Sequence, residues 1–290
     1  MFKKLSRAWG IAKMCWNVLK LDKELIVFPL LSLITCGLLL ASVVVPLWVS
    51  GNIEELLLMG AVFDEEGSFN FAGIAFDFAC YFVFYFIMIF FNTGLVACAR
   101  IRFSGGDPTI ADGLKASIQR LPQIFVWALT TSVVGFILSR IANNQEGIGK
   151  FVFAFLGAGW AIASFFVVPV LVAEKVGPIT ALKKSASAIK KTWGELLIAE
   201  IGMSALAVFI IMPAFIAFFI GMMLFDQVAP VFLITLAVLV VAWVFLTSLA
   251  FSALNGILKT ALYIYATEGT IPPLFDSDVI KNPAPVRESK

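Results

Sequence analysis

The sequence predicts an all-α polytopic membrane protein, and three observations support this fold class. First, 61% of the 290 residues are hydrophobic and 14% are charged, whereas about 25% of the residues in an ordinary soluble domain are charged. Second, the mean hydropathy is +0.98, so a soluble fold would lack the polar side chains needed to cover its surface. Third, the apolar residues are gathered in long runs, as in helices that cross a bilayer.

Six of these runs are long enough to cross the membrane, because a helix needs about 20 apolar residues to span ~30 Å of hydrocarbon. The predicted spans are residues 25–49, 71–99, 121–141, 151–173, 193–224 and 228–254. The fifth is longer than a crossing requires, which predicts a tilt or an end outside the membrane. The sixth is expected to continue as a helix to about Ala266. The first run starts too far along the chain, and is too long, for a cleaved signal peptide, so we expect a permanent span.

The distribution of Lys and Arg predicts the orientation of the spans. Most of these residues lie in the N-terminal segment, in the connection between spans two and three, and in that between spans four and five. The opposite connections hold Arg140 and Lys150, and the first of them is acidic around Asp64, Glu65 and Glu66. That acidic loop is interpreted as a solvated turn and not as a metal site. Because basic loops remain in the cytoplasm, we expect a bacterial inner-membrane protein with both termini cytoplasmic.

An amphipathic stretch precedes each odd-numbered span, and the three stretches share one spacing. Their apolar residues recur at +4, +3 and +4, which places them on one stripe of a helix. The stripes are Leu5, Trp9, Ala12 and Trp16; Leu114, Ile118, Leu121 and Phe125; and Leu182, Ala186, Ile189 and Trp193. Interfacial helices are therefore expected at about residues 2–20, 108–120 and 178–192. The fold is predicted as three repeats of an interfacial helix and a two-span hairpin, in one membrane domain at residues 1–271 with a loosely packed cytoplasmic tail at 272–290.

The opposite faces of these interfacial helices are basic. A helix with an apolar stripe and a basic back lies in the headgroup region against anionic lipid. The predicted headgroup contacts are Lys13, Lys115, Lys183, Lys184, Lys190 and Lys191. These helices either anchor the bundle or form a cytoplasmic collar that contacts lipids or a protein partner.

Three stretches of the chain resemble an uncharacterised family of six-span bacterial inner-membrane proteins. They are KELIVFPLLS at residues 23–32, GDPT at 106–109, and ALKKSASAIKKTWG at 181–194. The last stretch, extended to residue 197, is also distantly similar to the membrane domain found ahead of the catalytic domain in some glycerophosphodiester phosphodiesterases. The first resemblance implies a six-span fold over nearly the whole chain. Neither resemblance implies a catalytic or binding residue.

The composition argues against several classes of enzyme. The chain contains no histidine, which removes the commonest general base at neutral pH and the His-containing zinc sites. It has no P-loop sequence, and Gly105-Gly106 lacks the spacing of a dinucleotide-binding loop. The cysteines form no CxxC motif and are expected to be free, buried thiols; they are Cys15, Cys36, Cys80 and Cys98. We therefore expect no enzymatic activity, no cofactor, no bound metal and no nucleic-acid partner.

A candidate polar site is predicted near the cytoplasmic ends of the spans, because charge buried in hydrocarbon is costly and is usually functional. Glu200 lies just inside span five, with Lys259, Arg100 or Arg102 as its expected partner. The carboxylate either forms a structural ion pair or handles a proton or a substrate. The candidate site consists of Glu200, Asn92, Asn255, Lys259 and Arg100.

Three further features bear on this site. Asn92 and Asn255 are each followed closely by glycine, and they either hydrogen-bond between helices or line a polar path. Asp77 lies near the outer start of span two, where water and the positive helix end would surround it. Proline interrupts three spans and either bends these helices or marks a binding site; the residues are Pro29, Pro46, Pro169 and Pro213.

Two functions remain open from the sequence. In the first, the protein transports or accommodates a small molecule or a lipid within the bundle, through its polar residues. In the second, it is a membrane scaffold or assembly partner, acting through the basic collar on a protein partner or as a homo-oligomer. A continuous polar cavity that reaches Glu200 would favour transport, and a dry interior filled by Phe would favour the scaffold.

Overall fold

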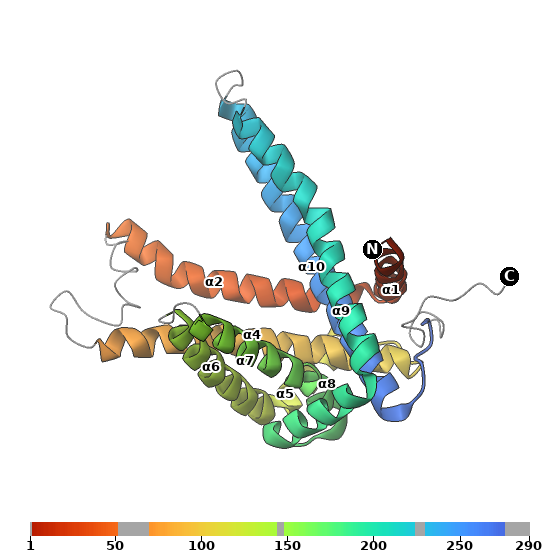
Figure 1. Ribbon diagram of the computed structural model, residues 1–290. Coiled ribbons are helices and arrows are strands. Elements are labelled where there is room, and N and C mark those ends of the chain that lie inside the picture. The colour runs from red at the N-terminus through yellow and green to blue at the C-terminus, as the bar shows by residue number, and fades with distance from the viewer. Residues whose placement is uncertain (1, 52–69, 144–147, 224–229, 276–290) are drawn as a thin grey trace. The chain divides into compact units, whose positions relative to one another are not determined.

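The computed structural model describes residues 2–51, 70–143, 148–223 and 230–275, with side chains except at 2–7, 142, 143, 148, 150, 191–198 and 230 (Figure 1). The described part is helical, with nine α-helices and one short 3₁₀ helix. These are α1 (Phe2–Leu21), η1 (Lys23–Ile26), α2 (Val27–Val49), α4 (Phe71–Phe103), α5 (Ile110–Gln119), α6 (Leu121–Asn143), α7 (Ile148–Ala163), α8 (Val167–Glu174), α9 (Pro178–Met223) and α10 (Pro230–Glu268). The acidic loop around Asp64 and most of the predicted tail lie outside the described residues.

Six helical segments among the described residues are long and apolar enough to cross a membrane. They are Lys23–Val49, Phe71–Phe103, Leu121–Ile141, Phe151–Glu174, Ala199–Met223 and Val231–Glu268. This agreement confirms the all-helical class and the six candidate spans. The sixth continues as a helix to Glu268, as expected. The three-fold repeat and the single domain at residues 1–271 stay predictions.

The structure differs from the prediction at the third interfacial helix. Two helices were expected, one at residues 178–192 and one from residue 193, but α9 runs without interruption from Pro178 to Met223. The residues across this junction are mostly strong helix formers, and an internal glycine such as Gly194 costs only about 1 kcal/mol relative to alanine. Nothing in the local sequence therefore ends the helix. By contrast, α5 and α6 are separate helices on either side of Arg120.

The fourth span is also different, because it is broken between α7 and α8. Pro169 has no N–H to donate to the Phe165 carbonyl, and its ring clashes with that turn. The chain turns at residues 164–166, and the Phe166 N–H donates instead to the Ser185 Oγ at 3.0 Å. Ser185 is fully buried. A hydroxyl from α9 therefore satisfies a backbone group that the proline-induced break leaves open.

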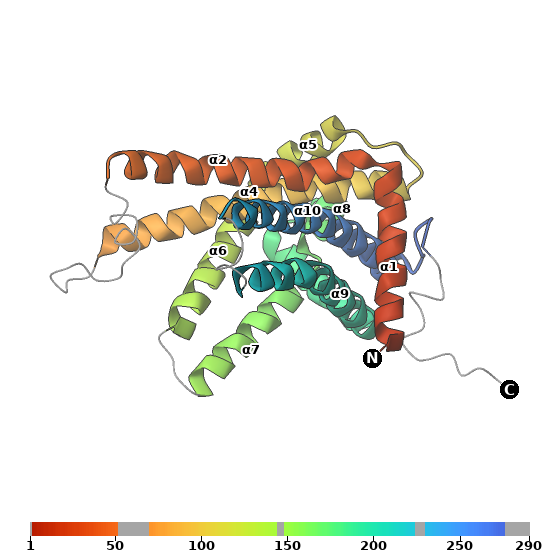
Figure 2. The same cartoon turned by 90° about the horizontal axis from the view of Figure 1, so that it is seen from above.

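The described residues form two compact units. The first unit comprises Met1–Val27, Cys98–Thr109 and Ala188–Lys290, and the second comprises Phe28–Ala97 and Ile110–Ser187. The first unit thus holds α1, η1, the end of α4, most of α9 and all of α10. In this unit α9 and α10 run side by side (Figures 1 and 2).

The core of the second unit depends on a glycine. A Cβ at Gly94 of α4 would lie 2.6 Å from the Phe28 ring of α2 and 3.2 Å from the Gly113 carbonyl oxygen of α5. The missing side chain lets three helices meet around the fully buried Phe28. Nearby, the Ser117 Oγ donates to the Phe90 carbonyl at 2.8 Å, which joins α5 to α4.

The first residues of the predicted tail are packed and not loose. Phe275 is 9% exposed, and its ring meets Phe103 edge-on with 5.7 Å between the centroids. An apolar side chain at the start of a polar segment is enough to fix it against the end of α4.

Candidate functional site

The first unit contains a junction at which α1 packs against α9 and α10. The buried face of α1 recurs at helical spacing and consists of Ala8, Ile11, Ala12, Cys15, Val18 and Leu19. A Cβ at Gly202 of α9 would lie 2.6 Å from the Ala8 Cβ, so the two helix backbones approach closely. Figure 2 shows α1 crossing beside α9 and α10.

The face of α1 that packs on protein is offset from the predicted apolar stripe. Of the stripe residues with described side chains, Ala12 is buried, whereas Trp9 and Trp16 are 59% and 42% exposed. Small side chains permit close packing, and the bulky indoles are left beside the contact. The Leu5 side chain lies outside the described part.

These indoles border an apolar groove of about 420 Å³ between α1, α9 and α10. Trp9, Ala12, Lys13 and Trp16 line it from α1 and Ile210 lines it from α9, while a row of residues from Trp243 to Leu254 lines it from α10. This volume lies in the range of ~300–1,000 Å³ that is typical of small-molecule sites. Among the described residues that line the groove, Lys13 alone is charged.

One wall of the groove is fixed by a hydrogen bond near a proline. Pro213 removes one backbone hydrogen bond from α9 and disturbs the preceding turn. In that turn, the Ile210 carbonyl accepts a hydrogen bond from the Trp243 Nε1 of α10 at 2.9 Å. The carbonyl that loses its partner to Pro213 is that of Phe209, so the Ile210 bond is an additional contact. It satisfies the indole N–H within the protein and orients the Trp243 side chain. Sequence reasoning identified Pro213 but not Trp243.

The predicted polar site is only partly brought together. The Lys259 Nζ lies 4.0 Å from the Glu200 Oε1, and Asn255 lies one turn before Lys259 on the same face of α10. Arg100 instead pairs with Glu268, also at 4.0 Å. Asn92 belongs to the second unit.

Two buried oxygens of this cluster have no hydrogen-bond partner among the described residues. They are the Glu200 Oε2 and the Asn255 Oδ1. An unsatisfied buried acceptor is costly in a medium of low polarity. Glu200, Asn255 and Lys259 therefore form an enclosed polar cluster between α9 and α10.

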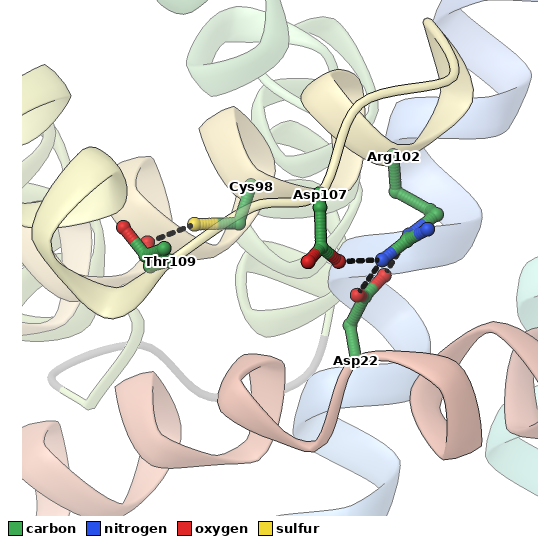
Figure 3. Close-up of polar contacts among 5 residues, drawn as sticks. All are labelled: Asp22, Cys98, Arg102, Asp107 and Thr109. Atoms are coloured by element: carbon green, nitrogen blue, oxygen red, sulfur yellow. Dashed lines mark hydrogen bonds and ion pairs between the residues drawn. The ribbon is translucent and has the colours of Figure 1, made fainter.

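The suggested pairing of Arg102 with Glu200 is wrong. The Arg102 Nε donates to the Asp22 Oδ2 at 2.5 Å, and its Nη2 donates to the Asp107 Oδ1 at 2.5 Å (Figure 3). Arg102 also donates to the second Asp22 oxygen. Asp22 is 1% exposed, so its charge must be paired, and Arg102 binds it through two nitrogens. The corner between α1 and η1 is thereby joined to the end of α4.

Two other charge contacts were not predicted. Asp77 pairs with Arg140 in the second unit, so the carboxylate has a cationic partner in addition to any water. Arg140 also lies over the Phe136 ring, 5.0 Å from its centroid. Lys184 pairs with Glu174. The sequence did carry a signal for the Asp77–Arg140 pair. Asp77 is the only Asp of span two and Arg140 is the only Arg of span three, and these two spans are adjacent in the chain.

The predicted headgroup lysines with described side chains are exposed, namely Lys13, Lys115, Lys183, Lys184 and Lys190; the Lys191 side chain lies outside the described part. None of the four cysteines forms a disulfide, as expected. Cys15 and Cys98 are buried, but Cys36 and Cys80 are half-buried. Burial raises the pKa of the Cys15 thiol above its ordinary value, so it remains neutral. No group of metal-binding side chains occurs among the described residues.

Comparison with known proteins now gives the family. A family model described as "Family of unknown function (DUF6159)" matches residues 71–272, well over half of the chain. The chain belongs to DUF6159. With its six candidate spans, this DUF6159 protein is a multi-pass membrane protein of unknown function. No curated protein and no solved structure is significantly similar to it.

Proposed function

We propose that this DUF6159 protein is a non-enzymatic inner-membrane protein that accommodates one acyl chain of an anionic lipid in the groove between α1, α9 and α10. The observation that carries the proposal is the chemistry of the groove, which is apolar along its length and charged only at Lys13 among the described lining residues. An acyl chain fits the apolar wall, and an anionic headgroup fits the lysine.

The length of the groove supports a lipid chain as its occupant. From Trp243 to Leu254, its wall on α10 extends ~16 Å at 1.5 Å per residue. This is about half of the ~30 Å hydrocarbon thickness, which is the depth of one leaflet. Trp9 and Trp16 would lie at the interface between this leaflet and water, where Trp side chains are enriched.

The excess of basic residues in alternate connections supports a cytoplasmic N-terminus and C-terminus. In that orientation α1 lies at the cytoplasmic surface, and the lipid belongs to the cytoplasmic leaflet. The three-fold repeat is part of the same proposal. It is supported by α1 before α2, by α5 before α6, and by the basic first turns of α9.

The proposal is tested by filling the groove. Ala250 lines it, so Ala250→Phe should displace the chain, whereas Ala242→Phe adds the same ring to an exposed position of α10 outside the groove. Native mass spectrometry of the purified protein should show that Ala250→Phe loses most of the co-purified lipid and that Ala242→Phe keeps it. Equal lipid retention by both variants would contradict the proposal.

The charge of Lys13 is tested separately. Lys13→Glu should abolish the preference for anionic over zwitterionic lipid, because it reverses the charge that faces the headgroup. Lys20→Glu makes the same change at an exposed residue of α1 that does not line the groove. A preference that survives Lys13→Glu would show that this lysine does not contact the headgroup.

A scaffold function is the second candidate, favoured by exposed apolar side chains on two predicted interfacial helices. Ile118 is 62% exposed and Ile179 is 71% exposed, and both suit a protein partner, a second copy of this chain or the lipid surface. Cross-linking from Ile118 in native membranes distinguishes these cases, since a scaffold gives a discrete protein adduct.

A further inference from the structure

We propose that Trp243 limits the length of the acyl chain that the groove between α1, α9 and α10 accepts. The inference rests on the proposed function, because it describes how that site selects among lipids by their chains. It makes Trp243 a specificity-determining residue, in addition to the charge of Lys13.

The groove has one end at α1 and the other at Trp243. The residues of α10 that line it recur at helical spacing, so they form one face of the helix; they are Trp243, Leu246, Thr247, Ala250, Phe251 and Leu254. The contact between Ala8 and Gly202 fixes α1 against the first part of the span in α9. Ile210, the lining residue of α9, lies ~12 Å farther along that helix at 1.5 Å per residue. Ile210 and Trp243 therefore mark the end of the groove that lies away from α1.

The indole at this end is held in place. The Trp243 Nε1 donates to the Ile210 carbonyl oxygen at 2.9 Å, from α10 to α9. The ring cannot swing aside without breaking this bond, and an N–H left unsatisfied in hydrocarbon is costly. Trp243 is 49% exposed, so half of its surface is open to a neighbouring chain. The indole is thus a fixed obstacle and not a mobile side chain.

The depth of Trp243 is unusual for a tryptophan in a membrane protein. The helix α10 begins at Pro230, so Trp243 lies ~20 Å from its start, and Leu254 lies ~16 Å beyond Trp243. Indoles are enriched at the two interfaces of a bilayer, whereas Trp243 lies far from either end of its span. An interfacial anchor does not explain this position, and a role in shaping the groove does.

Shape and not polarity ends the groove at Trp243. One turn farther from Leu254, the same face of α10 carries Leu239, which is 62% exposed, and Val240, which is 9% exposed. A lipid chain would meet side chains there that are as apolar as those of the groove. The bulky indole is what separates the two surfaces. A small residue in its place should therefore lengthen the groove by about one helical turn.

The test is a competition among lipids that differ only in chain length. Full-length protein in detergent micelles receives an equimolar mixture of phosphatidylglycerols whose acyl chains lengthen stepwise from myristoleoyl to erucoyl, and native mass spectrometry identifies the bound species. The wild-type protein should bind one length best and should discriminate against longer chains. Trp243→Ala should move this maximum to chains about four carbons longer, because one more helical turn opens ~5.4 Å of wall.

A second variant tests the same idea in the opposite direction. Leu246 lines the groove and is 62% exposed, so Leu246→Trp places an indole ~4.5 Å nearer to Leu254. It should move the maximum to shorter chains, even if Trp243→Ala folds poorly. Trp48→Ala is the control, because it removes a 71% exposed indole from α2 that does not line the groove. Its lipid distribution should match that of the wild-type protein.

The outcomes separate this inference from the proposed function. Unchanged chain-length distributions in both Trp243→Ala and Leu246→Trp would overturn the role of Trp243, as would an equal shift in Trp48→Ala. Either result leaves the groove intact as an acyl-chain site if Ala250→Phe loses its lipid. If Ala250→Phe binds every lipid of the mixture as the wild-type protein does, the groove itself is wrong.

Discussion

Ala8 and Gly202 meet so closely that no side chain fits between them: a Cβ at residue 202 would lie 2.6 Å from the Ala8 Cβ. This contact brings α1 against α9 in the first unit and positions one wall of the groove. Glycine is required here by the approach of a neighbouring helix and not by an unusual backbone conformation.

Gly202→Ala should therefore lower the free energy of unfolding by about 1–3 kcal/mol, the usual cost of overpacking. Ala8→Gly should restore much of the loss in the double variant, because it removes the clashing atom. Gly37→Ala is the matched control, since a Cβ at Gly37 of α2 meets nothing within 4 Å. Denaturant titration in detergent micelles measures all four proteins. Helix propensity alone would make both Gly→Ala changes stabilising, so an equal loss in Gly37→Ala would show that the contact with Ala8 does not decide the result.

Replacement of the buried Asp22 is also expected to lower the free energy of unfolding. Asp22→Leu removes the carboxylate that binds Arg102 through two nitrogens, and breaking a buried pair from one side costs about 3–5 kcal/mol. Asp107→Asn should change little, because the Asp107 side chain is 93% exposed. The same denaturant titration compares them. A larger loss in Asp107→Asn would mean that the loop contact, and not the buried one, holds this corner.

The hydrogen bond to Ser185 is expected to stabilise the turn between α7 and α8. Ser185→Ala would leave the buried Phe166 N–H without its acceptor, which costs about 1–3 kcal/mol. Ser187→Ala removes an exposed hydroxyl from the same helix and should be nearly neutral. Hydrogen exchange of the Phe166 amide provides a local readout, since it should accelerate in Ser185→Ala alone. Unchanged exchange would show that Ser185 does not protect this turn.

The orientation is tested by reporter fusions. Fusions at residue 60 should report the outer side, and fusions at residues 110, 185 and 285 should report the cytoplasm, because the basic connections remain inside. Residues 60 and 285 lie outside the described part of the chain. An outer signal at residue 185 would contradict both the orientation and the three-fold repeat.

The sequence by itself determined the six spans and the all-helical class. In hydrocarbon, each segment must satisfy its backbone groups by its own helical hydrogen bonds, so a long apolar run becomes a helix whatever surrounds it. The continuation of α10 past Lys259 follows the same local rule. The presence of a proline in the fourth span was also evident, although the break falls at residues 164–166, before Pro169 itself.

Only the tertiary structure decided which charges pair and where the groove lies. Arg102 and Asp22 are 80 residues apart, and Arg140 and Asp77 are 63 apart. Several cations at a similar depth were equivalent partners for Glu200 until the helix rotations were known. The groove depends on a one-residue offset, because Ala8 and Cys15 pack on protein while Trp9 and Trp16 do not. Side-chain periodicity defines an apolar face, but it is the close approach allowed by Gly202 that selects which part of that face is buried.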